Sequence, residues 1–226
     1  MILETGNPVV MPWIDNVGSV LQLWYPGQRG GEAIAALLTG EASPSGRLPI
    51  SFPRTEAELP RPKLDGWGLI RTMLDTEIIP FTLDYDREGS DDVGYRWFER
   101  SGAKPLFAFG HGLTYTSFRY SGLKLTGGRG ITASLEITNT GARDGVEVVQ
   151  LYAAPPGRTH RLVGWARVKL AKGERRRISI SANPRLLDSW SDLGWVRNAG
   201  VYSVRAAASA AEPGLKAKII LSNRGP

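Results

Sequence analysis

The most constraining feature of this sequence is a series of short segments after residue 117 in which apolar and polar residues alternate. The clearest runs from Ile131 to Ile137 and ends at the turn Asn139-Thr140-Gly141. Alternation with a period of two is typical of strands that turn one face to a core. Seven such segments are found, near residues 118–125, 131–137, 145–153, 161–170, 176–182, 200–207 and 215–221. They predict a seven-stranded, immunoglobulin-like β-sandwich over residues 118–226.

The predicted sandwich would have to be held by its core alone. The chain has no Cys, which excludes disulfides and Cys-based metal sites, and a zinc site built from its two His is not expected. We therefore expect no metal and no cofactor. Trp165 and Trp190 are expected to fill the core, because large aromatic side chains bury much apolar surface.

Residues 1–53 have a different pattern, typical of an α/β domain. The apolar run from Val20 to Tyr25 predicts a buried strand, and a glycine-rich turn then leads into a helix that ends at Gly40. The apolar residues of that helix recur at helical spacing, namely Ala33, Ile34, Leu37 and Leu38. The first strand ends almost where the sequence begins, so only part of such a domain is expected. Its sheet would expose an unpaired edge, which predicts self-association.

Residues 54–117 are interpreted as a connector that ends in an interdomain contact. They show no sustained period, and the first half of the connector carries several prolines. The aromatic-rich stretch after residue 94 includes Phe107, Phe109, His111 and Tyr115. These side chains could form a ligand-binding cage, but we favour a hydrophobic clasp that lies against both neighbouring parts.

The densest acidic cluster lies in this connector, at Glu88, Asp91 and Asp92. Paired carboxylates can serve acid–base chemistry or hold a cation. A loop of this composition is more often solvated or paired with nearby Arg side chains, such as Arg87 and Arg96. The residues alone therefore give the loop no catalytic role.

The net charge of +6 indicates attraction to anions but no specific partner. The excess is spread along the chain, apart from Arg175-Arg176-Arg177 after a turn. We interpret that run as a solvated sheet edge and expect no nucleic-acid partner, with binding to acidic polymers as a weaker alternative. No run reaches the roughly 18 apolar residues of a membrane span, and residues 1–5 lack a signal-peptide pattern, so neither a membrane nor a compartment is assigned.

Several blocks of the sequence carry a more specific signal. In chain order they are Gly6-Asn7-Pro8-Val9-Val10-Met11-Pro12-Trp13, Trp24-Tyr25-Pro26-Gly27-Gln28, Ser43-Pro44-Ser45-Gly46-Arg47-Leu48-Pro49, Val93-Gly94-Tyr95-Arg96-Trp97-Phe98 and Phe109-Gly110-His111-Gly112-Leu113-Thr114-Tyr115. Together they resemble the C-terminal part of glycoside hydrolase family 3, the β-glucosidase and β-xylosidase group. The strands at Gly145–Tyr152 and Leu162–Trp165 are similar to the fibronectin type III-like domain that ends many members. The resemblance supports a division into residues 1–53, 54–117 and 118–226.

The resemblance implies a retaining β-glycosidase that acts on β-linked oligosaccharides or aryl β-glycosides. Its Asp nucleophile and Glu acid/base lie in an N-terminal barrel and in the earlier part of an α/β sandwich domain, and no position here matches either. The expected role is that of a C-terminal fragment or truncated product, inactive alone, with Glu88, Asp91 and Asp92 at the rim of a sugar pocket and the N-terminal part as a partner in trans. The alternative is a stand-alone carbohydrate-binding or protein-interaction module whose exposed Trp residues bind sugar.

Overall fold

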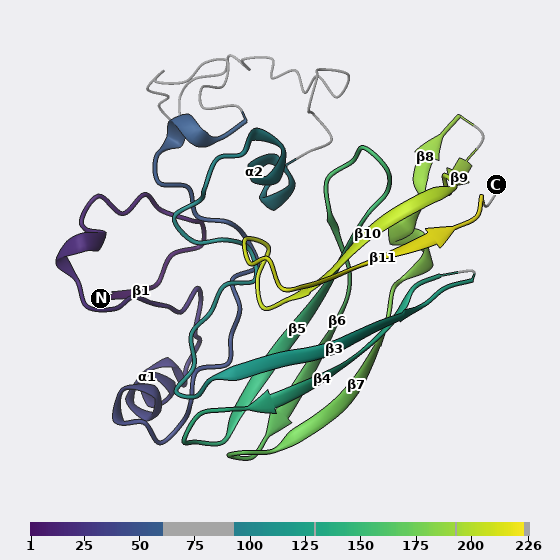
Figure 1. Cartoon of the computed structure of the whole chain (residues 1–226). Helices are drawn as coiled ribbons and strands as arrows, with labels where there is room; N and C mark the ends of the chain where they lie inside the picture. The colour runs from purple at the N-terminus through teal and green to yellow at the C-terminus, as the bar shows by residue number, and fades with distance from the viewer. Residues whose placement is uncertain (61–92, 129, 193, 224–226) are drawn as a thin grey trace, which may run out of the picture.

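Seven of the strands that follow residue 117 form two antiparallel sheets (Figure 1). The computed structural model describes residues 1–60, 93–128, 130–192 and 194–223. The three-stranded sheet has the order β3-β4-β7, with β3 at Phe118–Thr126, β4 at Thr132–Asn139 and β7 at Arg175–Ser181. The four-stranded sheet has the order β11-β10-β5-β6, with β11 at Leu215–Leu221, β10 at Gly200–Ala207, β5 at Gly145–Ala154 and β6 at Arg161–Leu170. Each predicted segment corresponds to one of these strands.

Apolar side chains from both sheets form a single hydrophobic core. In β4 burial alternates strictly along the strand, and Leu135 and Ile137 have no exposed surface. Burying one such side chain contributes about 1.5–3 kcal/mol. The other sheet adds buried residues to the same cluster, among them Val149, Leu151, Val168, Leu170, Val204 and Ala206. The period-two pattern of the sequence thus corresponds to the inner faces of the two sheets.

The expectation that Trp165 and Trp190 fill this core is wrong. Their side chains are 65% and 69% exposed, respectively. Trp165 has the same parity in β6 as the exposed Arg167 and Lys169, so it lies on the outer face. Trp190 lies outside both sheets, in the hairpin of β8 (Ser189–Ser191) and β9 (Gly194–Val196). Aliphatic side chains and Tyr202 fill the core instead.

The N-terminal part holds a two-stranded parallel sheet and one longer helix. Strand β1 (Ile2–Leu3) pairs with β2 (Leu21–Gln22). The predicted helix is confirmed as α1 (Gly30–Thr39), and it ends where Gly40 takes a left-handed conformation with φ of 76°. The predicted buried strand over residues 20–25 is wrong in extent and burial, because only two residues pair and both are half-buried.

Apolar side chains of this N-terminal part remain exposed. Helix α1 buries only Gly30 among its described residues, and Leu38 is 67% exposed. Tyr25, after β2, is 82% exposed. Parallel sheets are normally covered on both faces, and a two-stranded sheet is marginal by itself. The N-terminal part therefore presents an apolar surface that the described residues do not cover.

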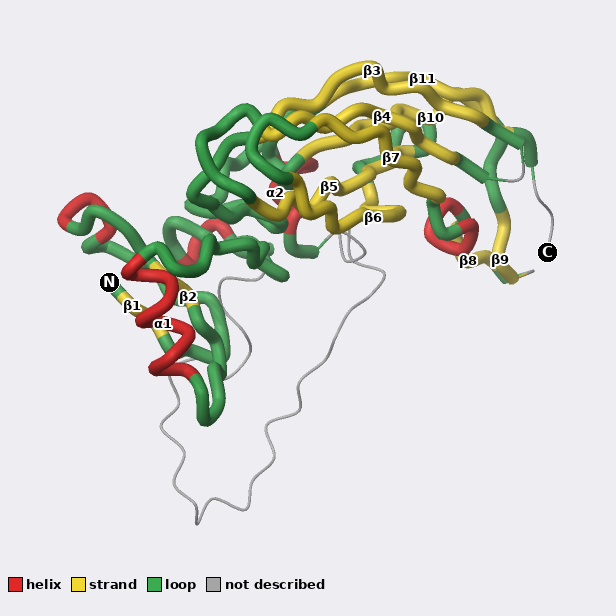
Figure 2. Tube along the Cα trace, turned by 90° about the horizontal axis from the view of Figure 1, so that it is seen from below, coloured by secondary structure: helices red, strands yellow, loops and turns green. Residues whose placement is uncertain are grey.

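A helix that the sequence did not predict lies between residue 93 and the long strands. Helix α2 (Tyr95–Ser101) begins after Gly94 and is preceded in the chain by the 3₁₀ helix Glu56–Glu58. A further 3₁₀ helix, Pro184–Leu187, follows β7. Figure 2 shows β1, β2 and α1 at one end of the molecule and the seven long strands at the other. Neither α1 nor α2, the α-helices of the described part, is long and apolar enough to cross a membrane.

Candidate functional site

The acidic residues predicted to lie near a sugar, Glu88, Asp91 and Asp92, fall outside the described residues. Their position at a pocket rim stays a prediction. The described part nevertheless shows how the chain on either side of them is anchored. Three groups of contacts and a pocket join segments that are far apart in the sequence.

The first group lies in the aromatic-rich stretch that was predicted to form a clasp. Its backbone pairs with the N-terminal part, since Phe52 N–H donates to the Phe107 carbonyl over 2.8 Å and Gly110 N–H donates to the Leu48 carbonyl over 2.7 Å. It also contacts the turn between β10 and β11, because Ala210 N–H donates to the Phe109 carbonyl over 2.9 Å. Phe107 and His111 stack on each other at 5.4 Å, and Phe109 packs on Tyr95 at 4.8 Å. Tyr115 is exposed and lies under the Arg143 guanidinium. Burial lowers the pKa of His111.

A buried glutamine on β5 fixes the clasp on the outer face of the four-stranded sheet. Gln150 is 3% exposed, and its amide nitrogen donates to the carbonyl oxygens of Gly110, over 3.2 Å, and Ala208. Its amide oxygen accepts from the Tyr152 hydroxyl over 2.6 Å. Of these three bonds, the one to Gly110 crosses to the clasp, whereas Ala208 and Tyr152 belong to the strand region itself. A clasp residue that displaced Gln150 without replacing this bond would leave a buried polar group unpaired, at a cost of about 1–3 kcal/mol.

A second buried polar contact crosses the same junction. Arg47, from the N-terminal part, lies 3.1 Å from the Glu147 carboxylate on β5, and their side chains are only 8% and 5% exposed. The Glu147 carboxylate also accepts from the Val148 backbone N–H. Burial, and secondly the charge of Glu147, raise the pKa of Tyr120 above its ordinary value. Glu147 therefore has a structural role, because its carboxylate joins β5 to the N-terminal part.

The third group links α2 to β10 through Glu99, His160 and Ser203. His160 Nδ1 lies 2.5 Å from a Glu99 carboxylate oxygen, and its Nε2 lies 3.2 Å from the Ser203 hydroxyl. The order of contacts is that of a serine hydrolase triad. However, β10 lies between β11 and β5, so its backbone N–H groups serve the two ladders and do not form an oxyanion hole. We interpret the group as a structural link.

This link predicts a pH-dependent contribution to stability. Burial would raise the pKa of Glu99, but the hydrogen bonds and charge of His160 outweigh burial and hold it below its ordinary value. A lowered folded-state pKa stabilises the fold above the unfolded pKa, and the contribution is lost as pH falls through the folded pKa. Glu99→Gln is expected to cost about 1 kcal/mol near pH 7, measured by urea unfolding, because the group is partly solvated.

The matched control is Glu136→Gln, since Glu136 pairs over 3.4 Å with an Arg175 side chain that is 67% exposed. A change of a few tenths of a kcal/mol is expected there. The difference between wild type and Glu99→Gln should vanish in acid. A difference that persists at low pH would show that the effect is not due to the carboxylate charge.

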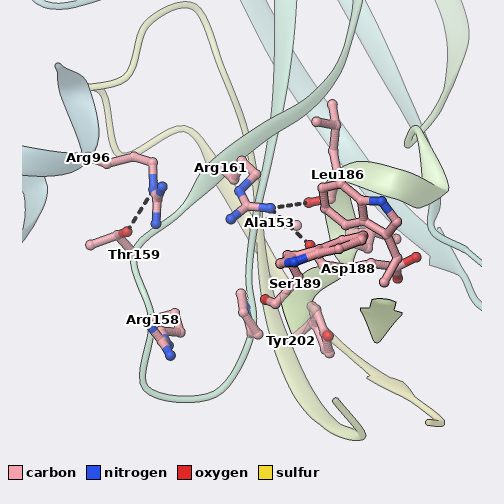
Figure 3. Close-up of a pocket in the computed structure, with 13 residues that line it drawn as sticks. Arg96, Ala153, Arg158, Thr159, Arg161, Leu186, Asp188, Ser189 and Tyr202 are labelled. Carbon is pink, nitrogen blue, oxygen red and sulfur yellow. Dashed lines mark hydrogen bonds between the residues drawn. The ribbon is translucent and has the colours of Figure 1, made fainter. Parts of the chain in front are cut away.

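The described residues also form a pocket beside the β8–β9 hairpin, with a volume of about 370 Å³. Side chains from four regions of the chain line it, including Arg96, Arg158, Arg161, Trp190, Trp195 and Tyr202. In Figure 3 the Arg161 guanidinium points to the carbonyl oxygens of Leu186 and Asp188, at 3.4 and 3.1 Å. The sequence did not predict this pocket, although Trp190 and Trp195 lie on either side of a turn.

The buried acids of the described part serve structural roles. Glu147 pairs with Arg47, and Asp188 accepts from Arg197 Nε over 2.7 Å, with both side chains of that second pair at most 3% exposed. Within the described ranges, no cluster of three His, Asp or Glu side chains could hold a metal ion. Glycoside hydrolysis needs two carboxyls at a set separation. Because Glu147 and Asp188 are both engaged in ion pairs, we assign neither of them a catalytic role.

Comparison with known protein families identifies the chain. Residues 1–115, just over half of the 226 residues, match the family model of the glycosyl hydrolase family 3 C-terminal domain. The chain belongs to glycosyl hydrolase family 3. A second model, the fibronectin type III-like domain, matches residues 147–210 of this family 3 chain. The resemblance inferred from the sequence blocks is thereby confirmed.

The relatives of this family 3 chain are β-glucosidases. It is 35% identical to the probable beta-glucosidase I of Aspergillus terreus, in a match that covers 94% of this chain and 26% of that protein. Among solved structures, DesR, a beta-glucosidase from Streptomyces venezuelae in complex with D-glucose, is 34% identical, with a TM-score of 0.81 over 98% of this chain and 28% of that one.

Beta-glucosidase 3B from Thermotoga neapolitana, in complex with glucose, is a further structural match to this family 3 chain. It is 32% identical, with a TM-score of 0.82, and the match covers 100% of this chain and 32% of that one. The chain thus spans between a quarter and a third of the length of these relatives.

Proposed function

We propose that this chain acts as the C-terminal part of a β-glucosidase, as a fragment or truncated product that supports the sugar pocket without supplying the catalytic pair. The observation that carries the proposal is the apolar surface of the N-terminal part, including Leu38 and Tyr25. Such a surface suits packing against further strands and helices of an α/β domain. The match to about a quarter of the Aspergillus terreus relative's length supports the same conclusion.

The remaining parts of the chain have separate roles in this proposal. Residues 118–226 act as a fibronectin type III-like, seven-stranded sandwich that supports the α/β part, consistent with the two sheets and their common core. The clasp and the Arg47–Glu147 pair fix the two parts relative to each other. The loop with Glu88, Asp91 and Asp92 contributes to the pocket rim, a role that rests on the family resemblance alone.

The substrate class follows from the relatives. DesR and beta-glucosidase 3B are described in complex with glucose. We therefore propose a β-linked glucoside, either an oligosaccharide or an aryl β-glucoside, as substrate of the assembled enzyme. Retaining hydrolysis needs two carboxyls about 5–5.5 Å apart. In this proposal the family resemblance places both of them in the barrel and the earlier α/β region of the assembled enzyme, not in this chain.

A complementation assay tests this proposal. The purified chain is expected to release no nitrophenol from 4-nitrophenyl β-D-glucopyranoside above buffer. Addition of the N-terminal part of a family 3 β-glucosidase is expected to give a complex on size-exclusion chromatography and to restore hydrolysis. Turnover by the chain alone that is lost in Glu88→Gln or Asp91→Asn would contradict the proposal and make the acidic loop catalytic. Absence of any complex would contradict the packing role.

A second candidate function is carbohydrate binding by the chain itself. It is favoured by three exposed indoles, with Trp165, Trp190 and Trp195 at 65%, 69% and 38% exposure. Exposed aromatic faces are common at sites that bind ligands with one apolar face. Saturable binding of cellobiose or laminaribiose by the isolated chain would support this function.

A further inference from the structure

We infer that the pocket beside the β8–β9 hairpin binds one pyranose ring of a neutral, β-linked glucan, with Trp190 as the stacking platform. This inference names the site for the second candidate function and does not depend on complementation. The pocket lies on the sandwich part and is formed by residues far apart in sequence, from α2, the 155–161 segment, the 3₁₀ helix Pro184–Leu187, the hairpin and β10.

The size and lining of the pocket suit a small sugar. Its volume of about 370 Å³ is at the lower end of the range of small-molecule sites, about 300–1,000 Å³. Its inner wall is apolar, with Leu187 and Tyr202 at 5% and 1% exposure. Polar side chains, including Thr159 and Ser189, line the same pocket. A pyranose has this combination, since its C–H faces are apolar and its edge carries hydroxyl groups.

The two indoles are held in a fixed arrangement. Trp190 and Trp195 are directly paired across the hairpin, and their rings meet edge to face at 5.4 Å. The Arg185 guanidinium lies 4.6 Å from the centre of the Trp195 ring. Trp195 is therefore held between two neighbours, whereas Trp190 keeps 69% of its surface exposed. An indole that is fixed yet exposed loses little conformational entropy when a ligand covers it.

The base of the pocket is also rigid before any ligand binds. Asp188, which lines it, is held by Arg197 in the buried pair at 2.7 Å. Arg161 joins the edge strand β6 to the backbone at Leu186 and Asp188 (Figure 3). These contacts fix the hairpin against the four-stranded sheet. Preorganisation of this kind favours binding because it lowers the ordering cost.

A neutral sugar is a better fit to this pocket than an inorganic anion. The Trp190 indole is the most exposed of the large apolar side chains that line the pocket, and it offers a small anion an apolar face and a single N–H donor. Arg96 and Arg161 also line the pocket, but they donate to the Thr159 hydroxyl and to the Leu186 and Asp188 carbonyl oxygens, respectively. Arg158 is the third arginine of the lining. Stacking on an indole requires a ligand with a flat apolar face, which phosphate and sulfate lack. Phosphate therefore serves as a competitor in the test rather than as the proposed ligand.

The test is a titration of the full chain with cellobiose and laminaribiose, followed by Trp fluorescence and by the indole N–H signals in NMR. Saturable binding at about millimolar concentration is expected. Trp190→Ala should weaken binding about tenfold or more, equivalent to about 1.4 kcal/mol. The affinity of Trp190→Phe should lie between those of the wild type and Trp190→Ala. Trp165→Ala is the matched control, because Trp165 is 65% exposed but does not line the pocket.

Each outcome decides the inference. If Trp190→Ala bound the sugar as the wild type does and Trp165→Ala did not, the sugar site would lie on the face that carries Trp165. This result would overturn the proposed pocket but would support carbohydrate binding by the chain. No saturable binding by the wild-type chain would overturn both. Phosphate that binds and displaces the sugar-induced signals would replace the sugar with an anion. Circular dichroism of each variant checks folding, which an exposed position such as Trp190 should leave unchanged.

Discussion

Gly110→Ala is expected to lower the free energy of unfolding by about 3 kcal/mol, the combined cost of backbone strain and lost buried hydrogen bonds. Gly110 has φ of 82°, a backbone conformation that residues with a β-carbon rarely adopt. A β-carbon there would lie 2.1 Å from the Gln150 amide oxygen, far inside van der Waals contact. Gln150 would have to move, and its bonds to the Gly110 and Ala208 carbonyls and to Tyr152 would be disturbed.

The control for this variant is Gly173→Ala. Gly173 has φ of 74°, and a β-carbon there would meet nothing within 4 Å. Gly173→Ala should therefore lower the free energy of unfolding only by the cost of backbone strain, about 1 kcal/mol. Urea unfolding at 25 °C compares the two variants. Equal losses in both would show that the contact of Gly110 with Gln150 contributes nothing beyond backbone strain.

Loss of one partner of the buried pair between Asp188 and Arg197 is expected to be more costly, about 3–5 kcal/mol. Asp188→Ala would leave the Arg197 guanidinium, in a residue with 1% exposure, without its carboxylate. A hydrogen bond from the Arg197 guanidinium to the Pro184 carbonyl, at 2.9 Å, does not neutralise the charge. Arg197→Ala should cost as much, because it leaves a buried carboxylate and a cavity.

A double variant separates charge from packing. Asp188→Leu combined with Arg197→Met removes both charges at similar volume and is expected to recover most of the stability lost in the single variants. Arg175→Ala, from an exposed pair, is the control and should change stability by at most about 0.5 kcal/mol. If the single variants lost less than about 1 kcal/mol, the pair could not be buried as described.

The sequence predicted the strands well because their signal is local. Alternation along Ile131 to Ile137 and the turn after it are visible within residues 131–141, and β4 follows that pattern residue by residue. Helix α1 and its end at Gly40 were predicted for the same reason. The burial of Trp165 and Trp190 was predicted wrongly, because residue type favours burial whereas strand parity and position outside the sheets decide it here.

The contacts that assemble the molecule could not be predicted in this way. Glu147 and Gln150 are polar residues in a strand and would be assigned to a solvated face, but the clasp and Arg47 cover them. Arg47 and Glu147 are 100 positions apart, so only the tertiary fold brings them together. The pocket likewise depends on the position of the β8–β9 hairpin, which the turn residues between Trp190 and Trp195 do not specify.

The buried junction has a consequence for chimeric enzymes. Near Phe118 the chain passes from the aromatic-rich stretch to the first of the seven long strands, which is a natural place to exchange the strand region between relatives. Arg47–Glu147, Gly110–Gln150 and the bond from Ala210 to Phe109 all cross that point. A graft made there would bring together two surfaces that were not selected for each other. Crossover points that transfer the Arg47 segment and the clasp together with the strands would keep the partners matched.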